Sequence, residues 1–335
     1  MFNREPGIGI DIGSKKIKVV QIKKKKKNTE IIQFNSMLTP SGIIEGGVIN
    51  DPQLLGEVMA PIVKELKLNG KQAVSAVSGQ QVYTRNIIMP VMPFAELREA
   101  VQFQAMSFLP IPVEEAVMDI FPLRDFEDEE GKKTEAFFVA VRKQQVEALD
   151  TACKIAGLNL TAVEIEPIAI NRALSPLCDD DIQAYLNIGA FRSFFAVFQN
   201  GMMIFYRNLS FGISAFYQLT AMGEDANREP GIKGEQQNDY DNLIQDIISE
   251  MARSLEYFEI QNRDSGDKVN KILICGGGSR IKQIEESLSS GIGRKFEVAD
   301  TLANFHLSAD VGQEAYNELK YDFTLALGLA ARADK

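Results

Sequence analysis

The residues of this chain best suited to chemistry stand in a short turn near the N-terminus. Gly13 lets the backbone reverse tightly, so its amide and those of Ser14 and Lys15 can converge on phosphate oxygens. Lys18 follows Ser14 by four residues and can reach back along a hairpin. Asp11, just before the turn, can hold Mg²⁺ through water. Taken alone, the turn is equally compatible with a plain β-hairpin.

A second turn of the same shape lies in the second half of the chain, where Asn187 is followed by Gly189 and Ala190. The chain therefore contains two comparable units, each opening with a strand, a glycine turn and a strand. Such a duplication indicates two lobes with a cleft between them, where ligands often bind. The phenylalanines that follow this turn, from Phe191 to Phe205, fit a buried core better than a base-stacking platform.

A third glycine turn follows a buried strand and consists of Gly276, Gly277, Gly278 and Ser279. Backbone without side chains can approach a flat base or a ribose closely. The turn is not a Walker A loop, because no Gly-Lys-Ser/Thr follows, and it lacks the GxGxxG spacing of a dinucleotide site. A flexible connection between a strand and a helix would have the same composition.

Strands and helices must hold these turns, and hydrophobic periodicity locates most of them. Alternation predicts strands at Gly7–Ile12, Ile17–Ile22, Glu30–Met37, Ala73–Val77, Val82–Met89, Ala116–Leu123, Ala136–Val141, Leu160–Ile165, Ala184–Ile188, Ser193–Gln199, Met202–Leu209 and Lys271–Cys275. Helical spacing predicts a first helix that begins after Asp51, its N-cap. Further helices are predicted at Phe94–Phe108, Lys143–Ala156, Pro167–Leu174, Leu243–Gln261, Arg280–Leu288 and Asp322–Arg332.

Three polar stretches separate these elements. The lysine run Lys23–Lys27 predicts a solvated hairpin tip, with contact to anionic lipid as the alternative. The charged segment Arg124–Lys133 predicts a second solvated tip, and Gly223–Asp241 predicts a mobile loop. The block of helix, two strands and helix from Phe94 to Ala156, which contains the second of these stretches, resembles a small subdomain inserted in a larger fold.

Composition excludes several classes of protein. The 335 residues carry 36 basic and 46 acidic side chains, a net charge of −10, which argues against a nucleic-acid binder. The three cysteines form no CxxC pair and fit a reducing compartment, and a single histidine, His306, leaves little for a histidine-dependent triad or metal site. Without a signal peptide or an apolar run of about 20 residues, the sequence predicts a cytoplasmic protein.

The order of the three glycine turns resembles the order found in the superfamily of actin, sugar kinases and heat-shock chaperones. There the first two turns are phosphate loops and the third is the adenosine loop. Two further segments fit that order. Glu166-Pro167-Ile168-Ala169, with Ala173 on the same helix, is similar to the first connecting helix of the superfamily, and Ala326-Leu327-Gly328-Leu329-Ala330 is similar to the second.

Within this superfamily the chain resembles the PilM family of type IV pilus assembly proteins over nearly its whole length. The similar segments are Gly9–Ser14 with Lys18–Val20, Thr84–Ile87 with Met89-Pro90, Leu109–Pro112 with Asp119, Ala140–Lys143, Ala156–Leu158 and Ala326–Leu329. That family shares a small inserted subdomain with the division protein FtsA, at the position where the sequence predicts one.

The resemblance implies an α/β fold: the actin-like (ribonuclease H-like) duplicated two-lobe fold with an FtsA-type inserted subdomain. Residues 1–84 and 158–181 would form the core of the first lobe together with a C-terminal helix at 322–335. Residues 85–157 would form the inserted subdomain, 182–222 and 268–321 the core of the second lobe, and 223–267 its smaller subdomain.

The resemblance also implies site residues and cofactors. ATP phosphates would be bound by Gly13, Ser14, Lys15, Lys18, Gly189 and Ala190, and adenosine by Gly276, Gly277, Gly278 and Ser279. Mg²⁺ would be held through water by Asp11 and Asn187. Glu166 is a candidate to position an attacking water, although a carboxylate before a proline also suits the start of a helix.

Two features depart from the family pattern. Family members commonly have Asp where this chain has Asn187, and an amide brings no charge to a metal-bound water. Gly223–Gln237 does not read as the lysine-bearing helix that usually helps to hold adenosine. Both departures favour nucleotide binding with weak or absent hydrolysis.

The resemblance implies an ATP-binding adaptor of the inner-membrane platform, peripheral to the membrane through a protein partner. Its partner would be the cytoplasmic N-terminal peptide of PilN, bound between the first lobe and the inserted subdomain. One alternative is an FtsA-like membrane-associated filament, although the chain stops at Lys335 with no tether expected. Another is a small-molecule kinase or phosphatase of the same superfamily, although no acceptor pocket or base is evident. Self-association is left open.

Overall fold

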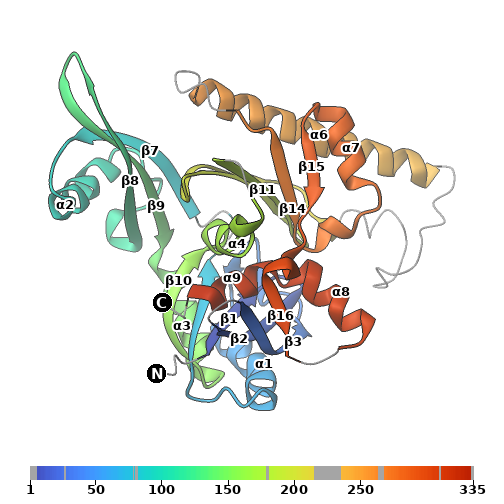
Figure 1. The fold of residues 1–335 in the computed structure, drawn as a ribbon. Helices are drawn as coiled ribbons and strands as arrows, with labels where there is room; N and C mark the ends of the chain where they lie inside the picture. Colours follow the sequence, from blue (N-terminus) through green and yellow to red (C-terminus); the bar gives the residue numbers. More distant parts are fainter. Residues whose placement is uncertain are drawn as a thin grey trace.

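The computed structural model describes most of the chain. Over residues 235–240 it describes the backbone alone. The described ranges are 6–25, 28–77, 79, 82–178, 181–214, 235–262, 268–308 and 311–332. Figure 1 shows two twisted sheets facing each other, with a third, smaller sheet set to one side. Each large sheet carries one of the predicted glycine hairpins.

The sheet of the first lobe has six strands in the order β10-β6-β1-β2-β3-β16. Their bounds are β1 Gly7–Ile12, β2 Lys16–Lys24, β3 Thr29–Leu38, β6 Gln72–Val77, β10 Asn159–Ile165 and β16 Phe305–Leu307. β1, β2 and β3 form an antiparallel meander, and β6 and β10 extend it in parallel. The short hairpin of β4 (Ile44–Glu45) and β5 (Val48–Ile49) lies apart from this sheet.

The sheet of the second lobe repeats this arrangement in the order β13-β12-β11-β14-β15. Its strands are β11 Ile182–Ile188, β12 Ser193–Gln199, β13 Met202–Leu209, β14 Lys271–Cys275 and β15 Lys295–Val298. β11 to β13 are antiparallel, and β14 and β15 are parallel, as in the matching strands of the first sheet. This repetition confirms the predicted duplicated two-lobe fold.

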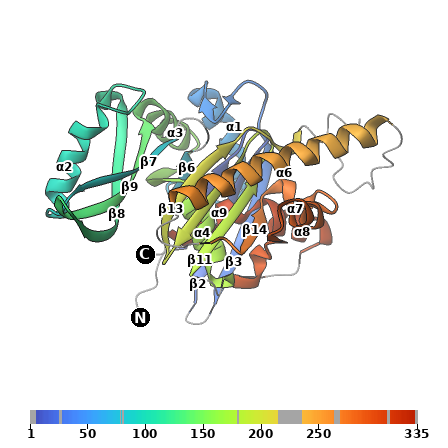
Figure 2. The same ribbon diagram turned by 90° about the horizontal axis from the view of Figure 1, so that it is seen from above.

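Helices pack against both large sheets and bury their apolar side chains. In the first lobe, α1 (Pro52–Glu65) packs on α3 (Lys143–Ile155), and Asp51 caps α1 by accepting a hydrogen bond from the Leu54 amide at 2.9 Å. In the second lobe, α6 (Glu235–Gln261) and α7 (Ile284–Ile292) pack against the sheet, as Figure 2 shows for α6.

Two helices lie side by side between the two large sheets: α4 (Glu166–Leu174) and α9 (Thr324–Arg332) (Figure 1). Glycines permit the close approach. A Cβ on Gly328 would lie 1.9 Å from the Ala169 carbonyl oxygen, and one on Gly9 would lie 2.0 Å from the Ala326 carbonyl oxygen. α9 is therefore fixed against both β1 and α4.

The inserted block forms a three-stranded sheet in the order β7-β9-β8 with one helix of its own. Its elements are β7 Val82–Pro90, α2 Phe94–Ala105, the 3₁₀ turn η2 Val113–Glu115, β8 Ala116–Asp128 and β9 Gly131–Arg142. Apolar side chains of α2 such as Leu97 and Val101 pack with Ile87 and Phe138 in a separate small core. Figure 2 shows α2 on the outer side of this sheet, away from α6.

The structure corrects several sequence predictions. β16 lies in the range assigned to the second lobe, yet it pairs in parallel with β3 of the first sheet, so the boundary at residue 321 was placed too late. The hairpin tip at 124–133 is shorter than predicted, since β8 continues to Asp128 and β9 begins at Gly131. Helix α6 begins at Glu235, inside the stretch predicted as a loop.

The predicted helix Arg280–Leu288 is also different. A 3₁₀ turn, η4, occupies Gly277–Arg280, and α7 begins only at Ile284 after Gln283 adopts a φ of +60°. The helix predicted near Asp322–Arg332 is α9, which begins two residues later at Thr324, and α8 (Gln313–Asp322) precedes it. Lys26, Lys27 and residues 215–234 lie outside the described residues. Across the described part of the chain, none of the helices combines the length and apolar character needed to cross a bilayer.

Candidate functional site

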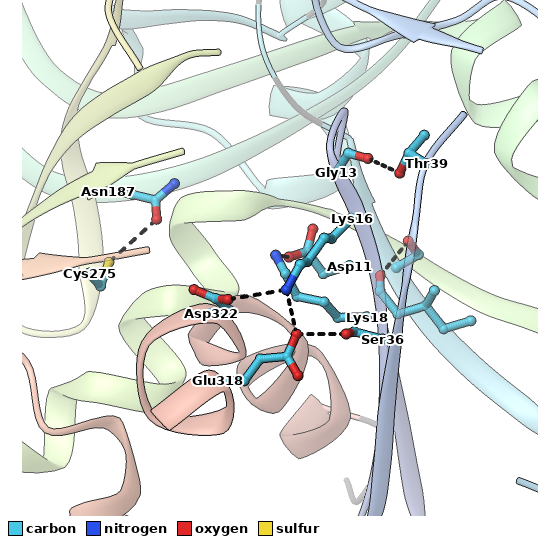
Figure 3. Close-up of polar contacts among 12 residues, drawn as sticks. Asp11, Gly13, Lys16, Lys18, Ser36, Thr39, Asn187, Cys275, Glu318 and Asp322 are labelled. Atoms are coloured by element: carbon cyan, nitrogen blue, oxygen red, sulfur yellow. Dashed lines mark hydrogen bonds and ion pairs between the residues drawn. The ribbon is translucent and has the colours of Figure 1, made fainter. Parts of the chain in front are cut away.

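The three predicted glycine turns come together around one cavity of about 370 Å³ between the lobes. Eleven of the predicted site residues line it: Asp11, Gly13, Ser14, Lys15, Lys18, Glu166, Asn187, Gly189, Ala190, Gly276 and Gly277. Figure 3 shows Asp11 and Lys18 on one side of this region and Asn187 on the other. The two lobes therefore contribute opposite walls of one cavity.

The first turn is held by backbone hydrogen bonds from β1, β2 and β3. The Gly13 amide donates to the Lys16 carbonyl at 3.1 Å, which closes the turn. The Thr39 hydroxyl donates to the Gly13 carbonyl at 2.7 Å, and the Thr39 amide donates to the Lys15 carbonyl at 2.9 Å (Figure 3). A Cβ on Gly13 would lie 2.9 Å from the Lys16 carbonyl oxygen, so a larger residue would deform the turn.

A largely buried ion pair stands behind the first turn. Lys18 Nζ donates to Asp11 Oδ2 at 2.6 Å, and the two side chains are 16% and 9% exposed. Burial disfavours the charged amine, but the carboxylates of Asp11, Asp322 and Glu166 outweigh that cost and raise the pKa of Lys18. Lys18 therefore carries a full charge at the back of the cavity.

A second group of charges joins the first hairpin to the C-terminal helices. Lys16 Nζ lies 2.7 Å from Glu318 Oε1 and 4.0 Å from Asp322 Oδ2 (Figure 3). Arg280, which comes from the second lobe, lies 3.0 Å from the same Asp322 carboxylate. Asp322 thus contacts cations from both walls of the cavity.

The second turn repeats the backbone of the first. The Gly189 amide donates to the Arg192 carbonyl at 3.0 Å, and a Cβ on Gly189 would lie 2.6 Å from that oxygen. The Ala190 carbonyl accepts from the Ser214 amide at 2.8 Å, which fixes the far side of the turn. Asn187 accepts a hydrogen bond from Cys275 Sγ at 3.6 Å, next to the third turn (Figure 3).

The third turn begins at Gly276, whose φ of +81° suits glycine. Its carbonyl accepts hydrogen bonds from the Ser279 amide at 3.0 Å and the Ser279 hydroxyl at 2.7 Å. A Cβ on Gly278 would lie 2.1 Å from Ile188 Cγ2, so this glycine allows β11 and the turn to touch. Among the described residues, the cavity wall includes Gly276 and Gly277, whereas Gly278 and Ser279 are buried behind it.

The cavity is basic although the chain as a whole is acidic. Five cationic and three acidic side chains line it, against a net charge of −10 for the whole sequence. The cations are Lys15, Lys16, Lys18, Arg192 and Arg280. Arg280 Nε is buried and has no hydrogen-bond partner within the described residues. Convergent amides, cations and an unsatisfied donor are the features that bind a polyphosphate anion.

The donor set fits a tightly held divalent cation poorly. Mg²⁺ prefers carboxylate and phosphate oxygens, and Asp11 is already paired with Lys18 while Asn187 is neutral. The described residues contain no group of three His, Cys, Asp or Glu side chains placed to hold a metal ion. The residues of this site therefore suit the polyphosphate better than the predicted metal.

Glu166 begins α4 and lines the cavity, so its position is consistent with both interpretations given above. Burial, and then the nearby Glu166 carboxylate, raise the pKa of the Cys275 thiol and of the Tyr206 hydroxyl. Both of those groups belong to the second lobe. Glu166 thus brings negative charge from the connecting helix to the junction of the lobes.

Four charged residues of the wall were not among the predicted site residues: Lys16, Arg192, Arg280 and Asp322. Arg280 directly follows the third glycine turn, and this neighbourhood could have drawn attention to it. Arg192 occupies the position in the second turn that Lys16 occupies in the first, because the carbonyl of each accepts from the glycine amide of its own turn. This repeated positive charge could have drawn attention to it. Asp322 gives no local signal, because only the fold brings α8 beside the first hairpin.

This chain is similar to known proteins in both sequence and fold. A family model described as type IV pilus assembly protein PilM matches residues 9–334. A solved PilM-PilN type IV pilus biogenesis complex contains a chain that superposes with a TM-score of 0.84, at 24% identity over 99% of both chains.

Two further solved structures share the fold at lower similarity. The ethanolamine utilization protein EutJ from Carboxydothermus hydrogenoformans has a TM-score of 0.55 at 14% identity, covering 97% of this chain and 89% of that one. MreB5 of Spiroplasma citri bound to ADP has a TM-score of 0.50 at 12% identity, covering 89% and 93%. With a fold of this actin-like kind and a family match along almost its entire length, the chain belongs to the PilM family of type IV pilus assembly proteins.

Proposed function

We propose that this protein is an ATP-binding adaptor of the type IV pilus inner-membrane platform. In this role it binds the cytoplasmic N-terminal peptide of a PilN-like membrane protein and is held at the inner membrane by that partner. The single observation that carries the nucleotide part is the meeting of three glycine turns around one basic cavity. Membership of the PilM family and the likeness to the chain of a PilM-PilN complex support the partner.

The site supports a specific orientation of the nucleotide. The Ser14 amide would receive the phosphates from the first lobe and the Ala190 amide from the second, while the Gly13 and Gly189 amides close the two turns by donating to carbonyls. Lys15 and Lys18 would add charge. The adenosine would lie against Gly276 and Gly277, where the nearest atom to a Cβ on Gly277 is Asp322 Oδ1 at 3.5 Å. Gly278 and Ser279 would then act by shaping this turn rather than by contact.

Weak or absent hydrolysis follows from the same residues. Hydrolysis needs positive charge that stabilises the negative charge developing on the leaving oxygens, and it needs a positioned water. Asn187 brings no charge, and Glu166 is the one acidic group at the start of α4 that could orient a water. A kinase or phosphatase would predict rapid turnover, so a phosphate-release assay separates that alternative from the adaptor.

The three-stranded sheet offers an apolar surface for the peptide. Val117 and Phe121 of β8 pair with Val141 and Phe137 of β9, so all four side chains share one face. Val141 and Phe137 are buried in the first-lobe core, whereas Val117 and Phe121 are 45% and 46% exposed. An extended peptide could cover these exposed residues where the inserted subdomain meets the first lobe.

Two titrations of the full chain test this function. ATP, or a non-hydrolysable analogue, should bind with one site per chain, and the partner's N-terminal peptide should bind the native protein. Phe121→Ser should weaken peptide binding about tenfold or more, as loss of a buried aromatic contact does. Phe103→Ser is the matched control, since Phe103 is 74% exposed on α2 at the outer side of the subdomain.

Each outcome bears on one half of the proposal. Equal peptide affinity for Phe121→Ser and Phe103→Ser would contradict the docking surface, and no peptide binding by the native protein would contradict the adaptor. Absence of nucleotide binding under every condition would contradict the nucleotide site.

A further inference from the structure

Arg192 stands apart from the other cations of the cavity. Lys16, Lys18 and Arg280 each form an ion pair with a carboxylate, at 2.7, 2.6 and 3.0 Å. Arg192 also lines the cavity and is half-buried, but it forms no ion pair with any carboxylate of the described residues. Its charge is therefore not compensated by a partner from the described part of this chain.

The position of Arg192 is suited to a ligand between the lobes. Its carbonyl closes the second phosphate turn by accepting from the Gly189 amide. Its guanidinium extends to the first lobe, where a Cβ on Gly46 would lie 3.3 Å from Arg192 Nη2. Gly46 and Gly47 line the same cavity, and their lack of side chains leaves room beside the guanidinium. The fork of a guanidinium matches phosphate oxygens in a bidentate geometry.

The two residues predicted to hold a metal ion already interact with neighbouring side chains. The Asp11 carboxylate accepts from Lys18 at 2.6 Å, and the Asn187 oxygen accepts from Cys275 and is uncharged. Mg²⁺ sheds its water reluctantly and relies on carboxylates together with phosphates. The second turn therefore combines an uncharged amide, Asn187, with an arginine that forms no ion pair within the described part of the chain.

We propose that the cavity binds a nucleoside polyphosphate without needing a divalent cation, and that Arg192 supplies the positive charge that a metal ion would otherwise bring to the phosphates. This inference rests on the proposed nucleotide site. It goes beyond that proposal by naming the counter-ion: a side chain of the second lobe. Since the guanidinium also faces Gly46 of the first lobe, phosphates on Arg192 would bridge the two walls.

The test is calorimetric titration of the full chain with ADP and with a non-hydrolysable ATP analogue, in Mg²⁺ and in EDTA. The native protein is compared with Arg192→Gln, which removes the charge, and Arg192→Lys, which keeps it. Arg98→Gln is the matched control, because Arg98 is exposed on α2 in the inserted subdomain. Thermal unfolding of each variant verifies that it is folded.

We expect the native affinity to change less than about threefold when Mg²⁺ is replaced by EDTA. In EDTA, Arg192→Gln should lose about tenfold or more, the cost of a charge-assisted hydrogen bond. Arg192→Lys should recover part of that loss, and Arg98→Gln should match the native protein.

Two results would overturn the inference. One is a loss of more than about tenfold in native affinity on chelation, and the other is an Arg192→Gln affinity in EDTA equal to the native value. Either result would leave the proposed nucleotide site intact, because binding in Mg²⁺ would still be observed. A native protein that binds no nucleotide in either buffer would instead remove the proposed function, and this inference with it.

Discussion

The first and second glycine turns share a backbone conformation and differ in charge. In both, the glycine amide donates to the carbonyl three residues later, and a Cβ on the glycine would collide with that carbonyl. The first turn is surrounded by ion pairs of Lys16 and Lys18, whereas the second combines a neutral Asn187 with Arg192, which has no ion pair among the described residues. One backbone conformation thus occurs in both lobes with different side-chain charges, and under the proposed function these charges would decide which ions accompany the phosphates.

The largest effect is expected from the buried ion pair of the first turn, Lys18 with Asp11. Lys18→Met leaves the Asp11 carboxylate buried without its partner, which should lower the free energy of unfolding by about 3–5 kcal/mol. Arg192→Gln should change it by less than about 0.5 kcal/mol, because no ion pair is lost. Chemical denaturation of both variants measures the difference.

A double variant controls for this interpretation. Asp11→Leu combined with Lys18→Met removes both charges, and should regain much of the stability that Lys18→Met loses. If the double variant is as unstable as the sum of its two single variants, the first turn does not depend on the ion pair. Equal destabilisation by Lys18→Met and Arg192→Gln would erase the asymmetry between the turns.

The next effect tests what the turns have in common. Gly13→Val and Gly189→Val each force a side chain against a carbonyl, at 2.9 and 2.6 Å for the first carbon alone. Both variants should lower the free energy of unfolding by about 1–3 kcal/mol, the usual range for overpacking, and their deformed turns should bind nucleotide more weakly. Gly312→Ala is the control, since nothing lies within 4 Å of its Cβ position. Loss of affinity in only one of the turns would show that the ligand contacts a single lobe.

The smallest effect depends on pH. Burial alone would raise the pKa of Glu318, but hydrogen bonds from Lys16 and Ser36 outweigh it and hold that pKa below its ordinary value. A lowered pKa contributes stability above the ordinary pKa of about 4.3, and this is lost as the pH falls through the folded value. Glu318→Gln should cost about 1 kcal/mol at neutral pH, since Lys16 is partly exposed.

The measurement is the unfolding free energy of native and Glu318→Gln protein between pH 7 and pH 3. The difference should shrink as the solution is acidified, because the native carboxylate is protonated there. A difference that stays constant across this range would show that the link between the first hairpin and α8 is not electrostatic. No such pH-dependent contact is expected at Arg192 in the second turn.

The elements that carry the turns were predictable from local pattern. Alternation located β1 and β2, and the Asp-Pro start located α1, because these signals lie within a few residues. β16 could not be found in this way, since three residues pair with Thr29–Ile31 far away in the sequence. The same is true of α8, whose one buried residue, Leu319, gives almost no periodic signal.

The candidate site divides along the same line. The glycines could be predicted because a tight turn needs them whatever surrounds it. The ion pair between Asp322 and Arg280 could not, since these side chains meet at 3.0 Å only because α8 returns beside the third turn. Gly278 was predicted beside the adenosine, but it packs against Ile188 of β11. The sequence alone does not reveal this packing between strand and turn.

The central claim is that one nucleotide touches all three turns at once. Hydrogen–deuterium exchange of the full chain, measured with and without saturating ATP analogue, tests it most directly. The account predicts slower exchange together in residues 11–18, 187–193 and 276–280. Saturable binding that protects only one of these segments, or none of them, would contradict it.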